Sequence, residues 1–140
     1  MINFVGETKK FKKTIQFYNE KMKNKDFSLL KFAQLYFGPY LYGVCHFPYT
    51  KRSHYVIKCR ANEEKTNYPT IYTFNVRLNK TYNLIQKDAI YQTAEEAIVW
   101  LLGHELFHYL RATQQIKGKN TEAQANEFGF KCLSEFKNYY

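Results

Sequence analysis

The sequence has few of the residues that form linkers and covalent cross-links. Only 6 of its 140 residues are glycine and only 3 are proline, so long disordered linkers are not expected. Cysteine is equally scarce. The 3 cysteines form no CxxC pair and leave one over, which argues against a disulfide framework. We expect a single domain over residues 1–140, located in the reducing cytoplasm, with Cys45, Cys59 and Cys132 as buried small residues.

Long hydrophobic runs are missing as well. No segment approaches the ~18 consecutive apolar residues of a membrane span, and residues 1–10 lack the apolar stretch of a signal peptide. These absences predict a protein with no membrane partner.

Positive charge is in excess, with 21 Lys and Arg against 12 Asp and Glu and a net charge of +9. Arginine supplies the smaller share, and no nucleic-acid-binding motif accompanies the charge. Two interpretations therefore stay open, a solvated lysine-rich exterior or a surface for nucleic acid or another acidic partner. The basic residues gather most densely at Lys9, Lys10, Lys12 and Lys13.

Hydrophobic residues make up 45% of the chain and aromatic residues 19%, which is enough for a real core. Residues 8–24 have apolar side chains at helical spacing and are predicted to form an amphipathic helix. Residues 28–37 are apolar nearly all round and predict a short buried helix that ends at Gly38-Pro39. The apolar stripe of the first helix consists of Phe11, Ile15, Tyr18 and Met22.

Three strand-like runs follow, at about 40–48, 53–60 and 70–78. The last run alternates apolar and polar residues with a period of two, which is typical of a half-buried strand. The simplest arrangement is a three-stranded, mainly antiparallel meander.

Two further helices are predicted from their capping signals. Thr93 is followed three residues later by Glu96, and Thr121 is followed by Gln124. The first of these helices should run to about Thr113, and the second to about Lys137. The fold class is therefore α+β, with helices at the N-terminus, a small sheet and two helices at the C-terminus.

The motif His104-Glu105-Leu106-Phe107-His108 lies late in the first of these two helices. Side chains at i and i+4 share one helical face, so the two imidazoles can hold one zinc ion. Glu105 between them can act as general base on a zinc-activated water, which is the arrangement of an HExxH metallopeptidase. A pair of structural histidines on a helix is the alternative.

Two histidines leave a catalytic zinc ion one protein ligand short. Glu122 and Glu127 on the last helix are the candidates, and their spacing prevents both from facing the metal. We choose Glu122, because Asn126 lies one turn further on the same face and can hydrogen-bond a ligand histidine. Glu127 is then expected to be a surface charge.

HELFH followed by Glu122, Ala125, Asn126, Phe128 and Gly129 resembles the glutamate-zincin pattern of ImmA/IrrE-type metallopeptidases. It is also similar to minimal single-domain gluzincins and HtpX-like peptidases. The resemblance implies a minimal zincin-like domain in which Glu122 is the third zinc ligand and Asn126 supports the site. It also implies that an edge strand binds an extended peptide, a role that falls on Val76, Arg77 and Leu78.

These observations predict a zinc-dependent metallopeptidase that hydrolyses peptide bonds of a protein substrate. Resemblance to ImmA-type proteins suggests that the substrate is a regulatory protein. One alternative is a binding module in which the zinc ion is structural and the basic surface contacts nucleic acid or protein. A DNA-associated protease would combine both. Retention of Glu105 favours catalysis, because a structural zinc site has no need of that carboxylate.

Overall fold

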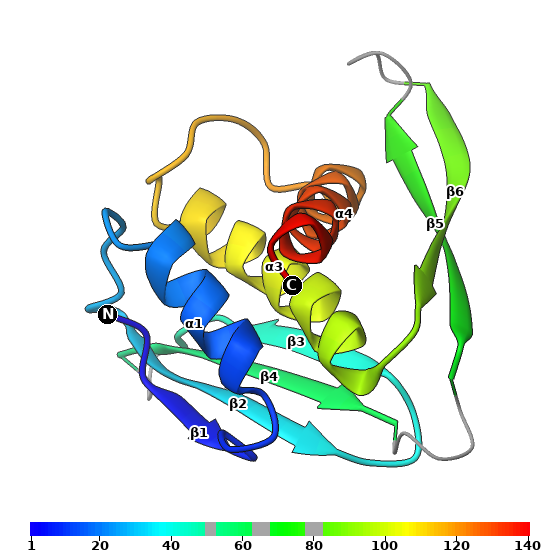
Figure 1. Ribbon diagram of the computed structural model, residues 1–140. Coiled ribbons are helices and arrows are strands. Elements are labelled where there is room, and N and C mark those ends of the chain that lie inside the picture. The colour runs from blue at the N-terminus through cyan, green and yellow to red at the C-terminus, as the bar shows by residue number, and fades with distance from the viewer. Residues whose placement is uncertain (50–52, 63–67, 78–82) are drawn as a thin grey trace.

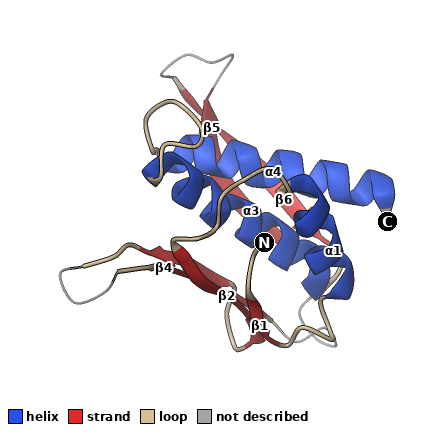
Figure 2. Ribbon diagram, turned by 90° about the vertical axis from the view of Figure 1, so that its left-hand side faces the viewer, coloured by secondary structure: helices blue, strands red, loops and turns tan. Residues whose placement is uncertain are grey.

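The computed structural model describes residues 1–49, 53–62, 68–77 and 83–140, and it is an α+β structure. The described helices all lie on one face of a four-stranded sheet, and a separate two-stranded hairpin stands beside them (Figures 1 and 2). The helices are α1 (Lys12–Lys21), α3 (Ala94–Ala112) and α4 (Glu122–Tyr139). None of the described helices is long and apolar enough to span a membrane.

The main sheet has the strand order β1-β2-β4-β3. β2 pairs in parallel with both β1 and β4, and β3 pairs with β4 in the antiparallel direction. The strands predicted at about 40–48 and 53–60 are confirmed as β3 and β4, together with their antiparallel pairing. The three-stranded meander is wrong, because the sheet is mixed and two of its strands come from the first forty residues. Its strands are β1 (Phe4–Gly6), β2 (Leu30–Phe37), β3 (Tyr42–His46) and β4 (Tyr55–Ala61).

The predicted buried helix over residues 28–37 is also wrong, because this segment forms β2. Ala33 and Leu35 are fully buried against the helices, whereas Phe32 and Tyr36 on the opposite face are only half-buried. Because the face of β2 that points away from the helices also carries aromatic side chains, the sequence does not alternate between apolar and polar residues. Periodicity alone does not distinguish such a strand from a buried helix.

The third predicted strand exists as β5 (Thr70–Arg77), but it pairs with β6 (Leu84–Tyr91) and not with the main sheet. We did not predict β6. Most of its residues are exposed, and only Ala89 and Tyr91 are buried, so its sequence has too weak an apolar alternation to indicate a strand.

Both predicted C-terminal helices are confirmed together with their caps. The Thr93 hydroxyl accepts a hydrogen bond from the Glu96 backbone at 3.1 Å, and the Thr121 hydroxyl accepts one from the Gln124 backbone at 3.3 Å. The first predicted helix is also confirmed as α1, with the shorter bounds given above.

α3 lies at the centre of the domain, with the sheet on one side and α1 and α4 on the other (Figure 1). Gly129 allows α4 to approach it closely, because a Cβ atom there would lie 2.8 Å from the Trp100 carbonyl oxygen. Cys59 and Cys132 are buried free thiols, as predicted, while Cys45 is a half-buried free thiol.

Candidate metal centre

The two histidines of the motif face the same way from consecutive turns of α3, as their spacing predicts. Their Nε2 atoms lie 3.2 Å apart. His104 is buried and His108 is half-buried, so both imidazoles are held at the edge of the core. The packing of α3 against the sheet therefore presents two nitrogen ligands at one point.

Glu122 brings a carboxylate to the same point from the first turn of α4. Its Oε2 lies 3.1 Å from His104 Nε2, and its Oε1 lies 2.9 Å from His108 Nε2. These three residues form a group whose ligand atoms all lie within 4.8 Å of one another. The structure thus joins the two predicted histidines to Glu122 and not to Glu127.

The separations match the geometry of one zinc ion. Ligand atoms about 2.0–2.1 Å from a tetrahedral zinc ion lie about 3.3 Å from each other. The observed 2.9–3.2 Å is close to that spacing, and two imidazoles with one carboxylate form a common catalytic zinc donor set. The residues present therefore fit a zinc ion. Of the Glu122 side chain, 77% is exposed, so the site opens to solvent on the α4 side.

Glu105 lies beside this group. It is 5% exposed, and its Oε1 lies 3.6 Å from His104 Nε2. Burial, and secondarily the negative charge of Glu122, raise the pKa of Glu105 to about 8. A carboxyl group whose pKa lies near neutrality is suited to accept and return a proton.

Burial and the neighbouring His108 lower the pKa of His104, while Glu122 acts in the opposite direction and raises it. The net lowering favours the neutral imidazole. Neutral imidazole is the form that coordinates a metal ion.

The predicted support from Asn126 is only partly present. Asn126 adjoins His104 and raises its pKa, but its amide nitrogen donates to the Asn75 carbonyl oxygen at 3.0 Å. His104 Nδ1 is buried and forms no well-aligned hydrogen bond with any described residue. Asn126 therefore connects α4 to β5 as well as bordering the site.

Asn120 supports the site in a way that the sequence did not reveal. Its Oδ1 lies 2.6 Å from His108 Nδ1, and its Nδ2 donates to the His108 carbonyl oxygen at 3.2 Å. A hydrogen bond at Nδ1 orients the ring so that Nε2 faces the metal position. The only signal in the sequence is that Asn120 immediately precedes the Thr121 cap, and this does not indicate a contact with α3.

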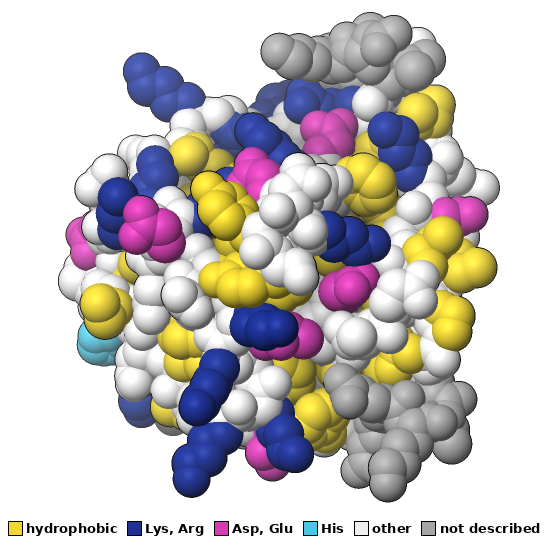
Figure 3. Space-filling view, in the orientation of Figure 1, with side chains coloured by type: hydrophobic (Ala, Val, Ile, Leu, Met, Phe, Trp, Pro, Cys, Tyr) yellow, Lys and Arg dark blue, Asp and Glu magenta, His cyan; other side chains and the backbone are white. Residues whose placement is uncertain are grey.

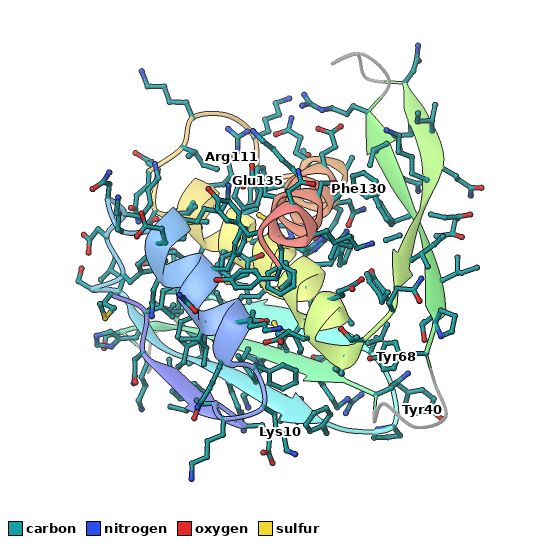
Figure 4. All side chains as sticks on the ribbon, in the orientation of Figure 1. Lys10, Tyr40, Tyr68, Arg111, Phe130 and Glu135 are labelled. Carbon is teal, nitrogen blue, oxygen red and sulfur yellow. The ribbon has the colours of Figure 1, made fainter. Side chains whose placement is uncertain are left out.

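The return loop between α3 and α4 closes tightly over Arg111, which lies at the end of α3 (Figure 4). Gly118 has a φ of +127°, and a Cβ atom there would lie 2.0 Å from Arg111 Nη1. Arg111 in turn donates to the Gln124 side chain at 2.9 Å. These contacts place the start of α4, and with it Glu122, opposite the histidines.

Of the three residues predicted to bind substrate, the structure describes Val76 and Arg77. Val76 is 4% exposed and packs in the core, and Leu78 lies outside the described residues. The Arg77 backbone and guanidinium both donate to Glu127, with the closest ion-pair contact at 3.1 Å. Glu127 is therefore a half-buried partner of Arg77 and not the surface charge that we expected. A substrate role for 76–78 stays a prediction.

A hollow of about 370 Å³ opens directly over Glu105, between β3 and β5. Gly43 of β3 faces this hollow, and a Cβ atom there would lie 3.4 Å from Glu105 Cγ. β3 is an edge strand of the main sheet, so its outer edge borders the site. Among its lining residues are Tyr42, Gly43, Thr73, Asn75, His104 and Glu105.

No protein-family model, curated protein or solved structure matches the chain. The resemblance to glutamate zincins therefore rests on the motif residues alone.

Proposed function

We propose that this protein is a zinc-dependent metallopeptidase that hydrolyses peptide bonds of a protein substrate. The observation that carries the proposal is the convergence of His104, His108 and Glu122 at zinc-ligand spacing. The buried Glu105 next to them favours a catalytic over a structural metal site. It supplies a general base, which a site that only binds metal does not require.

The proposed mechanism divides the work among five side chains. His104, His108 and Glu122 would hold the zinc ion. When bound, zinc would polarise the scissile carbonyl and lower the pKa of water, so that a hydroxide nucleophile becomes available near neutral pH. Glu105 removes a proton from the attacking water and delivers it to the leaving amine. Asn120 holds the His108 ring in position throughout.

The edge of β3 is the best-placed docking strand for an extended substrate. It borders the hollow above Glu105, and its outer edge pairs with no other described strand. An extended peptide can add to such an edge through main-chain hydrogen bonds. Gly43 leaves room for that peptide beside the general base.

A comparison of wild type with Glu105→Gln tests the proposal. Each protein is loaded with zinc and incubated with a peptide library prepared from a whole proteome, and new amino termini are quantified by mass spectrometry. We expect wild type to generate termini with a shared sequence preference, and Glu105→Gln to generate none while retaining zinc. Glu20→Gln is the matched control, because it removes one exposed carboxylate away from the site and should cleave like wild type. Equal cleavage by Glu105→Gln and wild type would refute the catalytic role.

A further inference from the structure

The face of the main sheet that points away from the helices is not covered by any described helix (Figure 2). Ala33, Leu35, Ile57 and Cys59 are fully buried on the helix side. Successive side chains of a strand alternate between faces, so their neighbours point outward. The register of the strands then sets these outward side chains in cross-strand rows.

One row is aromatic with a cation at its centre. Arg60 of β4 lies between Tyr36 of β2 and Tyr42 of β3. Its guanidinium is 5.3 Å from the centre of the Tyr42 ring, and its Nε donates to the Tyr40 carbonyl oxygen at 2.9 Å. These contacts hold a guanidinium beside aromatic side chains on an open sheet, which is a surface that can stack against nucleobases.

A second feature lies further along the same face. A hollow of about 550 Å³ is lined by two lysines and two histidines together with a serine hydroxyl. Lys31 and Lys58 form no ion pair with any residue in the described part of the chain. Arg60 lies four positions along β4 from Val56, which lines the hollow, a distance of about 13 Å. The lining residues are Lys31, Phe32, His46, Ser53, His54, Val56 and Lys58.

The charged side chains on the strands of this sheet are all positive. The described strands β1 to β4 contain no Asp or Glu at all, while they contribute Lys31, Lys58 and Arg60. The side of the molecule seen in Figure 3 has lysines and acidic side chains interspersed. The positive charge on the sheet therefore has no acidic neighbours within these strands, and it would complement a polyanion.

We propose that this open sheet face binds single-stranded nucleic acid, with the Tyr36–Arg60–Tyr42 row stacking on bases and the hollow at Lys31 and Lys58 holding phosphates. A single strand is favoured over a duplex because aromatic side chains on a sheet face can stack only on unpaired bases. Apart from Tyr42, which also lines the hollow over Glu105, the residues of this surface lie away from the metal centre. The proposal does not rest on the proposed peptidase activity.

Fluorescence anisotropy with labelled oligo(dT) and oligo(U) of twenty nucleotides tests the proposal. Lys31→Ala/Lys58→Ala should weaken binding and reduce the slope of log affinity against log salt by about 1.4, since each phosphate contact to a single strand contributes about 0.7. Lys117→Ala/Lys119→Ala is the matched control, because it removes two exposed lysines from the α3–α4 loop on the helix side. The control should bind like wild type.

Tyr42→Ala tests the stacking separately and should weaken binding by about fivefold or more, whereas Tyr42→Phe keeps the ring and should retain affinity. Binding of either RNA or DNA supports the proposal, and the two probes show which is preferred. Glu105→Gln should bind like wild type, so a failed peptidase assay leaves this result intact. Equal weakening by both lysine pairs, or binding of duplex as tight as single strand, would overturn it.

Discussion

The most quantitative prediction concerns Glu105 in the metal-free protein. Its carboxyl group has a pKa of about 8 when folded and an ordinary value of 4.5. Between those values the folded protein retains a proton that the unfolded chain has lost. The free energy of unfolding therefore falls as pH rises through this window. With about 1.36 kcal/mol per pKa unit, the loss between pH 6.5 and 8.5 is about 2 kcal/mol.

The assay is urea unfolding in the presence of EDTA at pH 6.5, 7.5 and 8.5. This range was chosen because the lowered pKa of His104 affects stability mainly below the ordinary histidine value of 6.5. Wild type should lose about 2 kcal/mol over the range. Glu105→Gln should lose much less and should be the more stable protein at pH 8.5. Bound zinc should flatten the wild-type curve, because a cation favours the ionised carboxylate.

Subtracting the Glu105→Gln curve cancels the titration of groups that do not interact with Glu105, so the difference reports this carboxyl and its coupling to neighbours such as Glu122. Parallel curves for the two metal-free proteins would show that Glu105 is ionised when folded. That result would refute the account of Glu105 as a buried base near neutrality.

Three further predictions concern particular contacts. Asn120→Ala should lower zinc affinity about 10-fold to 100-fold without unfolding the protein, measured by competition with a zinc indicator, because it frees the His108 ring; unchanged affinity would contradict this role. Gly129→Ala should lower the free energy of unfolding, measured in urea, by about 1–3 kcal/mol, because the added Cβ meets the Trp100 carbonyl oxygen. An unchanged free energy of unfolding would contradict the close contact between α3 and α4. Gly43→Val should reduce peptide cleavage while leaving zinc content unchanged, since it fills the space between β3 and Glu105; full activity would argue against the β3 docking strand.

α1, α3, α4 and the convergence of the candidate metal ligands were predictable from sequence because their signals are local. The i, i+4 spacing of His104 and His108 fixes their shared face, and the hydroxyls of Thr93 and Thr121 fix where α3 and α4 begin. Glu122 was chosen over Glu127 because Asn126 lies one turn further on the same helical face, and the structure brings Glu122, in the first turn of α4, to the two histidines.

The sheet was not predictable because its order depends on pairing between distant segments. β2 lies between β1 and β4 in parallel, a connection that no turn signal in the sequence specifies. Asn120 was missed for a related reason, since its contact with His108 depends on the path of the return loop. The placement of Val76 was also hidden, because the segment pairs with β6 in a hairpin packed on α4 and not with the main sheet.

The central claim is that His104, His108 and Glu122 together hold one zinc ion while Glu105 does not coordinate it. Isothermal titration of the metal-free protein with zinc, repeated for His104→Ala, Glu122→Gln and Glu105→Gln, measures this most directly. We predict one ion per chain for wild type and Glu105→Gln, no specific binding for His104→Ala, and strongly weakened binding for Glu122→Gln. Zinc binding that is unchanged by His104→Ala and Glu122→Gln, or absent from wild type, would contradict the account.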